Sequence, residues 1–353
     1  MVLNRVRLLE MLGTLVLGAL GALAPLTYAG SGSPSVNHPT GTHGLIMVDK
    51  VGGRVLLFGP SGDRQLAELH PSADTAQRPH EVAISPDAHT AYVSVYGDGV
   101  FGRNPHPGHT IAVIDLPTRR MVGSIDVSPY RAPHGMQVDA AGRLYVACDL
   151  DQKVLVIDPA SRHIEAAIDV GEAGHWIALA PVEGRIYVSG HGASPFISVI
   201  DVQSRRVIDR IPIEHGTMGI TASPDGHTVL AADAAGPILH IISARSDREI
   251  GQVRVRNYDR GLYKVFYSPD GRYVLTCLPT GQINIFEATD LQSPQRIVHS
   301  PGTALMGFAF SADGRSAVTG NHGEGTVSRI DLTHALVTDT FAAGKGVETL
   351  AYY

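Results

Sequence analysis

A four-strand unit that recurs at a fixed spacing constrains the fold of this chain more than any other feature. Residues 130–170 contain four short runs rich in Val, Ile and Tyr, and turn residues separate them, which is typical of an antiparallel meander. A similar turn between the first two runs returns along the chain. Its glycines lie 42 to 45 residues apart, at Gly142, Gly184, Gly226, Gly271 and Gly314. Such a sheet cannot bury both of its faces alone, so the copies must pack on one another.

The two ends of the chain supply one further unit between them. Residues 346–353 (GVETLAYY) match only a first strand, whereas residues 44–69 match only a second, third and fourth strand. Pairing the C-terminal strand with the N-terminal hairpins closes the array and removes an open sheet edge. The sequence therefore predicts an all-β fold, a seven-bladed β-propeller of four-stranded blades over residues 44–353.

The N-terminus has the pattern of an export signal. Arg5 and Arg7 precede an apolar run over residues 8–23, and Thr27-Tyr28-Ala29 has the small residues of a cleavage site. We therefore expect residues 1–29 to be a signal peptide and residues 30–43 a flexible tether. An uncleaved membrane anchor is the alternative, although the run is short for a span and Glu10 lies in it. The expected location is the periplasm or the exterior, with no membrane span after cleavage.

Charge and cysteine content narrow the function classes. The net charge is −6 with His neutral, and no dense Lys/Arg tract is present, which argues against a nucleic-acid partner. Cys148 and Cys277 hold equivalent positions in units that lie on opposite sides of a closed ring, so we expect two buried thiols rather than a disulfide.

The repeat resembles that of a known family. The Ser-Pro-Asp-Gly turn at 223–226 and 268–271, the Tyr-Val second strand and the Val-Ile-Asp third strand are similar to those of YVTN-repeat propellers. The resemblance covers nearly all of the chain after the leader. It implies an exported seven-bladed fold in which the first strand of each blade lines the central channel. It also implies that ligands bind at the top face, where that strand begins, but it implies no particular activity.

Aligning the units places an unusual set of side chains at the start of the first strands. By symmetry these residues should form one ring at the channel mouth, and several are of the types that bind metals or haem. The ring consists of His80, His134, His175, Met218, Tyr263, Met306 and Glu348. His191 and His322 follow second strands and should reach the same face, so the candidate metal ligands are His80, His134, His175, His191 and His322. Residues 97–109 form an insertion that could cover the mouth as a lid.

These residue types leave several functions open. The first is an exported propeller that binds a metal ion, a metallo-cofactor or another small ligand, with copper, zinc and haem as the cofactors to consider. The second is a periplasmic oxidoreductase or a propeller that binds a d-type haem. An oxidoreductase would need an electron-transfer partner, because the chain has no haem attachment motif. A lactonase-like hydrolase using Glu81, Glu348 or a histidine and a scaffold that docks a partner protein are further alternatives. The same side chains would also suit a water-filled structural channel.

Overall fold

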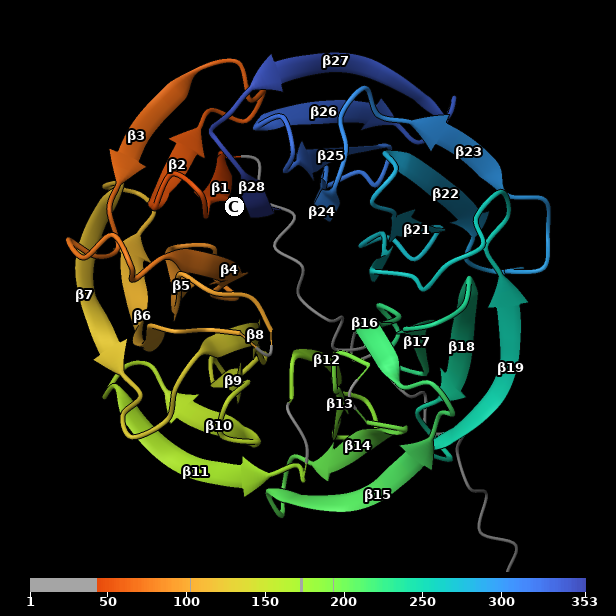
Figure 1. Ribbon diagram of the computed structural model, residues 1–353, viewed down its shortest axis with the longest axis horizontal. Coiled ribbons are helices and arrows are strands. Elements are labelled where there is room, and N and C mark those ends of the chain that lie inside the picture. Colours follow the sequence, from red (N-terminus) through yellow and green to blue (C-terminus); the bar gives the residue numbers. More distant parts are fainter. Residues whose placement is uncertain (1–42, 102, 172–173, 193) are drawn as a thin grey trace, which may run out of the picture. The chain divides into compact units, whose positions relative to one another are not determined.

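The structure is a computed structural model that describes residues 43–353 except 102, 172–173 and 193. The described part is all-β, and its strands form seven antiparallel four-stranded sheets arranged as blades in a ring (Figure 1). This confirms the predicted seven-bladed β-propeller. The leader predicted over residues 1–29 and nearly all of the tether lie outside the described residues. Within the described part, no helix has the length and apolar character needed to cross a membrane.

Each blade is an antiparallel meander in which the first strand lies at the hub and the fourth at the rim (Figure 1). The innermost strands are β4 (Pro79–Ile84), β8 (Pro133–Val138), β12 (Trp176–Ala180), β16 (Thr217–Ala222), β20 (Lys264–Tyr267), β24 (Leu305–Phe310) and β28 (Val347–Tyr352). The second strands are β5 (Thr90–Gly97), β9 (Leu144–Cys148), β13 (Arg185–Ser189), β17 (Thr228–Asp233), β21 (Tyr273–Cys277), β25 (Ser316–Asn321) and β1 (Leu45–Asp49).

The outer two strands complete each blade. The third strands are β6 (Pro107–Asp115), β10 (Lys153–Asp158), β14 (Phe196–Asp201), β18 (Ile238–Ser243), β22 (Gln282–Glu287), β26 (Thr326–Asp331) and β2 (Arg54–Phe58). The fourth strands are β7 (Arg120–Asp126), β11 (His163–Asp169), β15 (Arg206–Pro212), β19 (Arg248–Arg254), β23 (Arg296–His299), β27 (Leu336–Ala342) and β3 (Gln65–Leu69).

Burial explains why the strands of one blade differ in pattern. Strand β9 packs between neighbouring blades on both faces, and all five of its residues are buried, so its sequence is continuously apolar. The rim strand β11 has one face toward solvent and alternates between exposed and partly buried residues. The apolar core is divided among the interfaces between neighbouring blades.

The recurring turn is built from its own side chains. In the turn at 223–226, Ser223 Oγ donates to Asp225 Oδ1 at 2.5 Å and accepts from the Thr228 amide at 3.0 Å. Gly226 has a φ of 73°, in the left-handed region that costs glycine little. The residue types that marked the repeat in the sequence are therefore those that this turn requires.

The ring closes as the sequence predicts. Strand β28 pairs antiparallel with β1, with Met47 opposite Leu350 and Leu45 opposite Tyr352. The His43 amide also donates to the Tyr353 carbonyl at 2.8 Å. Figure 1 shows the first and last strands side by side in one blade. Strand β1 therefore has a paired neighbour on both sides.

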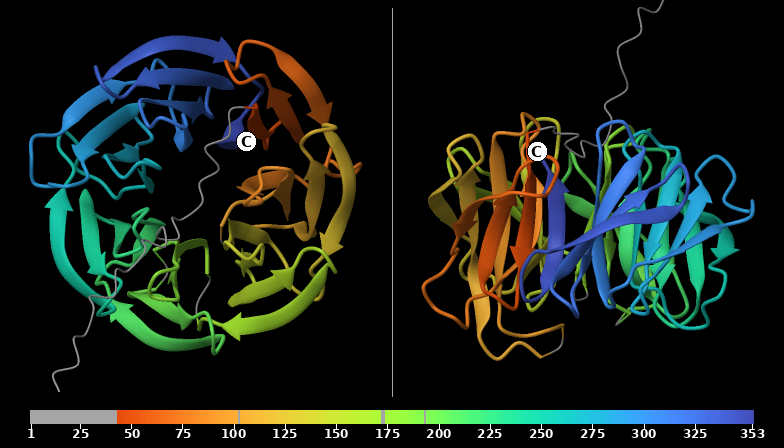
Figure 2. Two further views of the ribbon diagram at one scale, coloured as in Figure 1. Left: turned by 180° about the vertical axis from the view of Figure 1, so that it is seen from behind. Right: turned by 90° about the horizontal axis from the view of Figure 1, so that it is seen from above.

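The inserted segment of residues 97–109 is partly taken up by longer strands. Strands β5 and β6 have eight and nine residues, and an isolated bridge joins Val100 to Arg103 between them. In the side view of Figure 2 this β5–β6 connection extends beyond the body of the ring on one face. Cys148 and Cys277 are both buried free thiols.

Candidate functional site

One end of the central channel holds a cavity of about 270 Å³ lined largely by histidine and charged residues. It lies where the inner strands begin, so the closed ring brings together side chains that are far apart in the sequence. Of the nine predicted site residues, eight line this cavity: His80, His134, His175, His191, Tyr263, Met306, His322 and Glu348. Met218 is not among the lining residues; it packs against the apolar clusters between blades.

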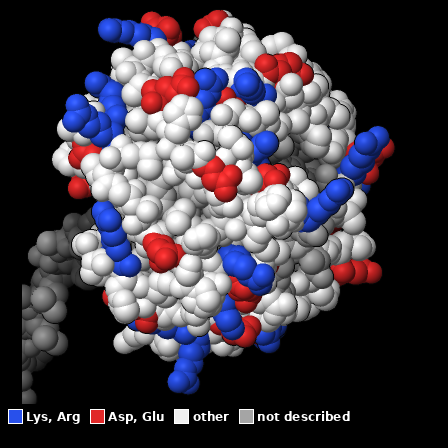
Figure 3. Space-filling model, turned by 60° about the vertical axis from the view of Figure 1, so that its left-hand side comes forward, with Lys and Arg blue, Asp and Glu red and all other residues white. Residues whose placement is uncertain are grey.

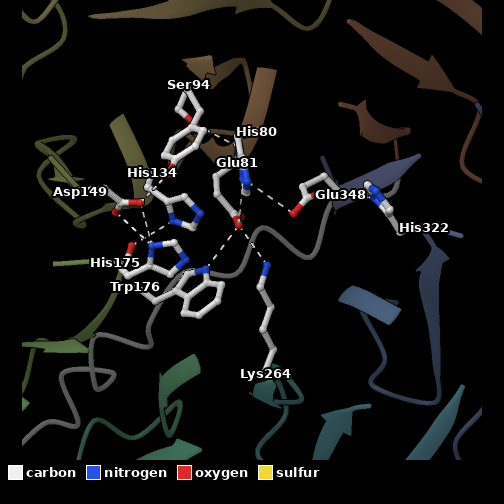
Figure 4. A network of polar contacts seen from close by, with 11 residues as sticks. His80, Glu81, Ser94, His134, Asp149, His175, Trp176, Lys264, His322 and Glu348 are labelled. Atoms are coloured by element: carbon white, nitrogen blue, oxygen red, sulfur yellow. Dashed lines mark hydrogen bonds and ion pairs between the residues drawn. The ribbon is translucent and has the colours of Figure 1, made fainter. Parts of the chain in front are cut away.

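Three imidazoles lie in contact along one side of the channel (Figure 4). His134 and His175 stack with ring centroids 3.6 Å apart and an interplanar angle of 25°. His80 lies 4.4 Å from His134, also between centroids. All three residues are at most 4% exposed. We call them the imidazole cluster.

Hydrogen bonds orient two rings of the imidazole cluster. His175 Nδ1 lies 3.0 Å from both carboxylate oxygens of Asp149, and the Tyr96 hydroxyl donates to Asp149 Oδ2 at 3.0 Å. His134 Nδ1 lies 3.1 Å from the His175 carbonyl oxygen, which can only accept. Each Nδ1 must therefore carry the proton when its ring is neutral. The Nε2 atoms of both rings are left with a lone pair, and neither has a hydrogen-bond partner among the described residues.

Burial keeps the imidazole cluster neutral. Desolvation lowers the pKa of His80, His134 and His175 well below the ordinary value, and nearby positive charges, including Lys50 for His80, lower it further. Desolvation also raises the pKa of Asp149 to about 6. A neutral imidazole is the form that binds a metal ion.

A buried ion pair crosses the hub beside the cluster. Lys264 Nζ, from β20, lies 3.0 Å from Glu81 Oε1 of β4, and Trp176 Nε1 donates to the same oxygen at 3.4 Å (Figure 4). Burial raises the pKa of Glu81, but the charge of Lys264 and the surrounding hydrogen bonds outweigh it, so this pKa is lowered overall. Glu81 is thus an ionised, paired carboxylate, which makes it a poor general base.

Lys264 is a site residue that the sequence analysis did not identify, because only one position per blade was compared there. It lies one residue after Tyr263, and the next position in every blade faces a second cavity of about 160 Å³ in the channel. The residues of this second ring are Glu81, Gly135, Trp176, Gly219, Lys264, Gly307 and Thr349. Its two opposite charges could have been found by the same alignment.

Glu348 joins the imidazole cluster to the opposite side of the mouth. Its Oε1 lies 3.5 Å from His80 Nε2, and its Oε2 lies 3.2 Å from His322 Nδ1. His80 Nδ1 is buried and has no hydrogen-bond partner; it lies 3.7 Å from Glu81 Oε1. The third imidazole therefore also has a ring nitrogen that no hydrogen bond occupies.

The β5–β6 connection contacts this site through Phe101. The Phe101 ring stacks on His191 with centroids 4.2 Å apart and meets His175 edge-on at 5.3 Å. His191 in turn lies 4.4 Å from His175. The inserted segment thus reaches the imidazole cluster, as expected for a segment that covers the mouth.

Two groups of side chains place metal-ligand atoms close to one another. In one group, His134, Asp149 and His175 each offer a ligand atom within 4.8 Å of the others, and in the other, His80, Glu81 and His134 do so. Two ligand atoms of a tetrahedral zinc ion lie about 3.3 Å apart. The ligand atoms of each group must therefore move closer together to share one ion.

Surface charge offers no competing site on the face seen in Figure 3. There Lys and Arg side chains are interspersed with Asp and Glu, and no patch of one sign dominates. This pattern is typical of a solvated surface.

Comparison with known proteins supports the fold and leaves the family open. No family model matches the chain. The structure resembles a functionally unknown protein from Desulfotomaculum acetoxidans (TM-score 0.72, 12% identity, 88% of this chain and 98% of that one). It also resembles Kuenenia stuttgartiensis hydrazine synthase (TM-score 0.66, 20% identity, 78% of this chain and 89% of that one).

A curated relative matches only a short stretch. Autophagy-related protein 18 of Meyerozyma guilliermondii is 32% identical over 74 residues, which is 21% of this chain and 13% of that protein. The two structural likenesses support the propeller fold, and membership of the YVTN-repeat family stays a prediction.

Proposed function

We propose that this chain is an exported β-propeller that binds a divalent transition-metal ion at its channel mouth, on the imidazoles of His80, His134 and His175. The observation that carries the proposal is the way Asp149 and the His175 carbonyl hold two Nδ1 protons. Metal-binding histidines commonly donate their second ring N–H to a carboxylate or a carbonyl, which fixes the tautomer and the orientation of the ring. Both forms of that contact occur here, on adjacent rings.

The donor set favours an ion that prefers nitrogen ligands. Neutral imidazoles with a nearby carboxylate suit zinc, copper(II) or iron(II). A soft, thioether-rich copper site is less well supported, because Met218 packs in the core and only Met306 lines the cavity. A volume of about 270 Å³ lies just below the range of roughly 300–1,000 Å³ that is usual for ligand pockets, so it favours an ion with a small ligand over a haem macrocycle.

The proposed location rests on the leader. Export would place the site in the periplasm or outside the cell, where a propeller that holds a metal could exchange electrons or substrate with a partner protein docked over the mouth. No described residue bears on that part of the proposal.

Metal titration tests the binding proposal. Chelator-treated full-length protein is titrated with Zn²⁺ and Cu²⁺ by calorimetry, and the fluorescence of Trp176, the single tryptophan, reports on the hub. We expect one ion per chain, with Cu²⁺ bound more tightly than Zn²⁺. His134→Ala/His175→Ala should abolish binding, whereas His89→Ala/His334→Ala, which removes two surface rings, should leave it intact. Equal binding by the two double variants would refute the proposal.

A hydrolase is the second candidate, because His175, which lines the cavity, forms an Asp–His pair with Asp149. Asp149 would stabilise the protonated ring as His175 accepts a proton from water, against the desolvation that lowers the pKa of His175. If this is the function, metal-free protein should open small lactones, and His175→Gln should abolish the reaction. Activity that appears only with added metal would assign the chemistry to the metal site instead.

A further inference from the structure

The mouth cavity contains the ammonium group of a buried lysine that forms no ion pair with any described residue. Lys50 follows β1, lines the cavity and is only 9% exposed. Its Nζ lies 5.3 Å from the centroid of the Tyr96 ring, and its side chain forms no hydrogen bond or ion pair with any described residue. A buried lysine is normally paired, because desolvating an ammonium ion is costly.

Carboxylates lie near Lys50, but none is within ion-pair distance of its Nζ, and each contacts other side chains. Asp149 is held by His175 and Tyr96, and Glu81 by Lys264 and Trp176. Two more carboxylates line the cavity: Glu348 contacts His80 and His322, and Asp98 binds His106 at 2.9 Å. The ammonium group of Lys50 therefore has three donor hydrogens and no hydrogen-bond acceptor among the described residues.

We propose that the mouth cavity binds a small oxyanion, either an inorganic anion or the carboxylate of a small organic acid, through the ammonium group of Lys50. The guanidinium of Arg78 lines the same cavity and adds positive charge. The cavity has room for a compact ligand of a few non-hydrogen atoms beside the imidazole cluster. The proposal goes beyond the metal site, because it rests on Lys50 and holds whether or not an ion is bound.

A bound metal would strengthen the same preference. A divalent ion held by neutral imidazoles would add positive charge to the cavity that Lys50 lines. It would therefore increase the attraction of the cavity for an oxyanion held by Lys50. The proposed substrate or ligand class is thus a small acid rather than a neutral sugar or an amine.

Anion titrations of full-length protein test this assignment. Acetate, glycolate, sulfate and inorganic phosphate are each titrated into metal-free and Zn²⁺-supplemented protein, using calorimetry and Trp176 fluorescence. We expect at least one anion to bind, with affinity lowered at least about tenfold in Lys50→Met, the factor expected for a charge-assisted hydrogen bond. Lys50→Arg should retain most of the affinity. Lys345→Met, which removes an exposed lysine near the same face, is the matched control and should match wild type.

The outcomes separate this proposal from the metal proposal. Lys50-dependent anion binding without zinc binding would support the anion site and refute the metal site. Anion binding that requires zinc but not Lys50 would overturn the anion assignment and keep the metal site. Absence of binding by all four anions in both forms would also overturn it. Stronger binding of acetate and glycolate than of sulfate and phosphate would identify the ligand as an organic acid.

Discussion

Acid should destabilise the metal-free protein through the imidazole cluster. Burial lowers the pKa of His80, His134 and His175 in the folded protein, whereas the unfolded chain protonates them near pH 6.5. Groups whose pKa is depressed by folding contribute stability that is present above the unfolded pKa and is lost as the pH falls toward the folded pKa. The free energy of unfolding should therefore decrease once the pH drops below about 6.5.

The size of the effect follows from proton counting. An imidazole that is protonated in the unfolded chain but not in the folded protein lowers the free energy of unfolding by about 1.4 kcal/mol for each pH unit of acidification. Three such imidazoles lower it by about 4 kcal/mol per pH unit. Asp149 acts in the opposite sense, because its pKa is raised to about 6 and the folded protein takes up that proton first. The net expected loss is about 3 kcal/mol between pH 6 and pH 5, a large part of the roughly 5–15 kcal/mol that stabilises most proteins.

Urea unfolding at a series of pH values, with chelator present, measures this slope. His134→Gln should reduce the pH dependence by about one proton, or about 1.4 kcal/mol per pH unit. His89→Gln should leave it unchanged, because the His89 side chain is 69% exposed. A wild-type slope below about 1.4 kcal/mol per pH unit, or equal slopes for wild type and His134→Gln, would refute the reasoning.

Two further changes test the hub. Lys264→Met should cost about 3–5 kcal/mol of unfolding free energy at pH 7, because it leaves Glu81 buried and unpaired, and Lys264→Met/Glu81→Leu should recover most of that loss. A double variant no more stable than the single one would contradict this. Gly135→Ala should destabilise by about 1–3 kcal/mol, because a Cβ there would lie 2.4 Å from the His175 carbonyl oxygen. Gly307→Ala, whose Cβ would meet nothing closer than 3.9 Å, should change stability by less than about 0.5 kcal/mol; equal effects in thermal unfolding would count against the channel geometry.

The fold could be predicted from the sequence because its signals are local and repeated. A turn such as Ser223–Gly226 requires its own residue types, and each further copy confirms the spacing of the strands. Closure followed from matching residues 346–353 to a missing first strand. The positions of His80, His134 and His175 at the mouth then follow from the symmetry of the ring.

Side-chain orientation could not be predicted in the same way. Met218 shares the ring position of His175, yet its side chain packs between blades, because packing against neighbours decides the rotamer. The hydrogen bond between His175 and Asp149 depends on the conformation of the chain directly after β9, the second strand of the neighbouring blade. Lys50 follows a strand in the blade assembled from both termini, so comparison with the other repeats gives little indication of it.

Anomalous X-ray scattering from crystals grown with zinc would locate the metal ion directly. We expect one strong zinc peak in the hub, about 2.0–2.1 Å from the Nε2 atoms of His134 and His175, with His80 or a solvent ligand completing the coordination. Zinc found only at exposed rings such as His89 and His334, with none beside the imidazole cluster, would contradict it.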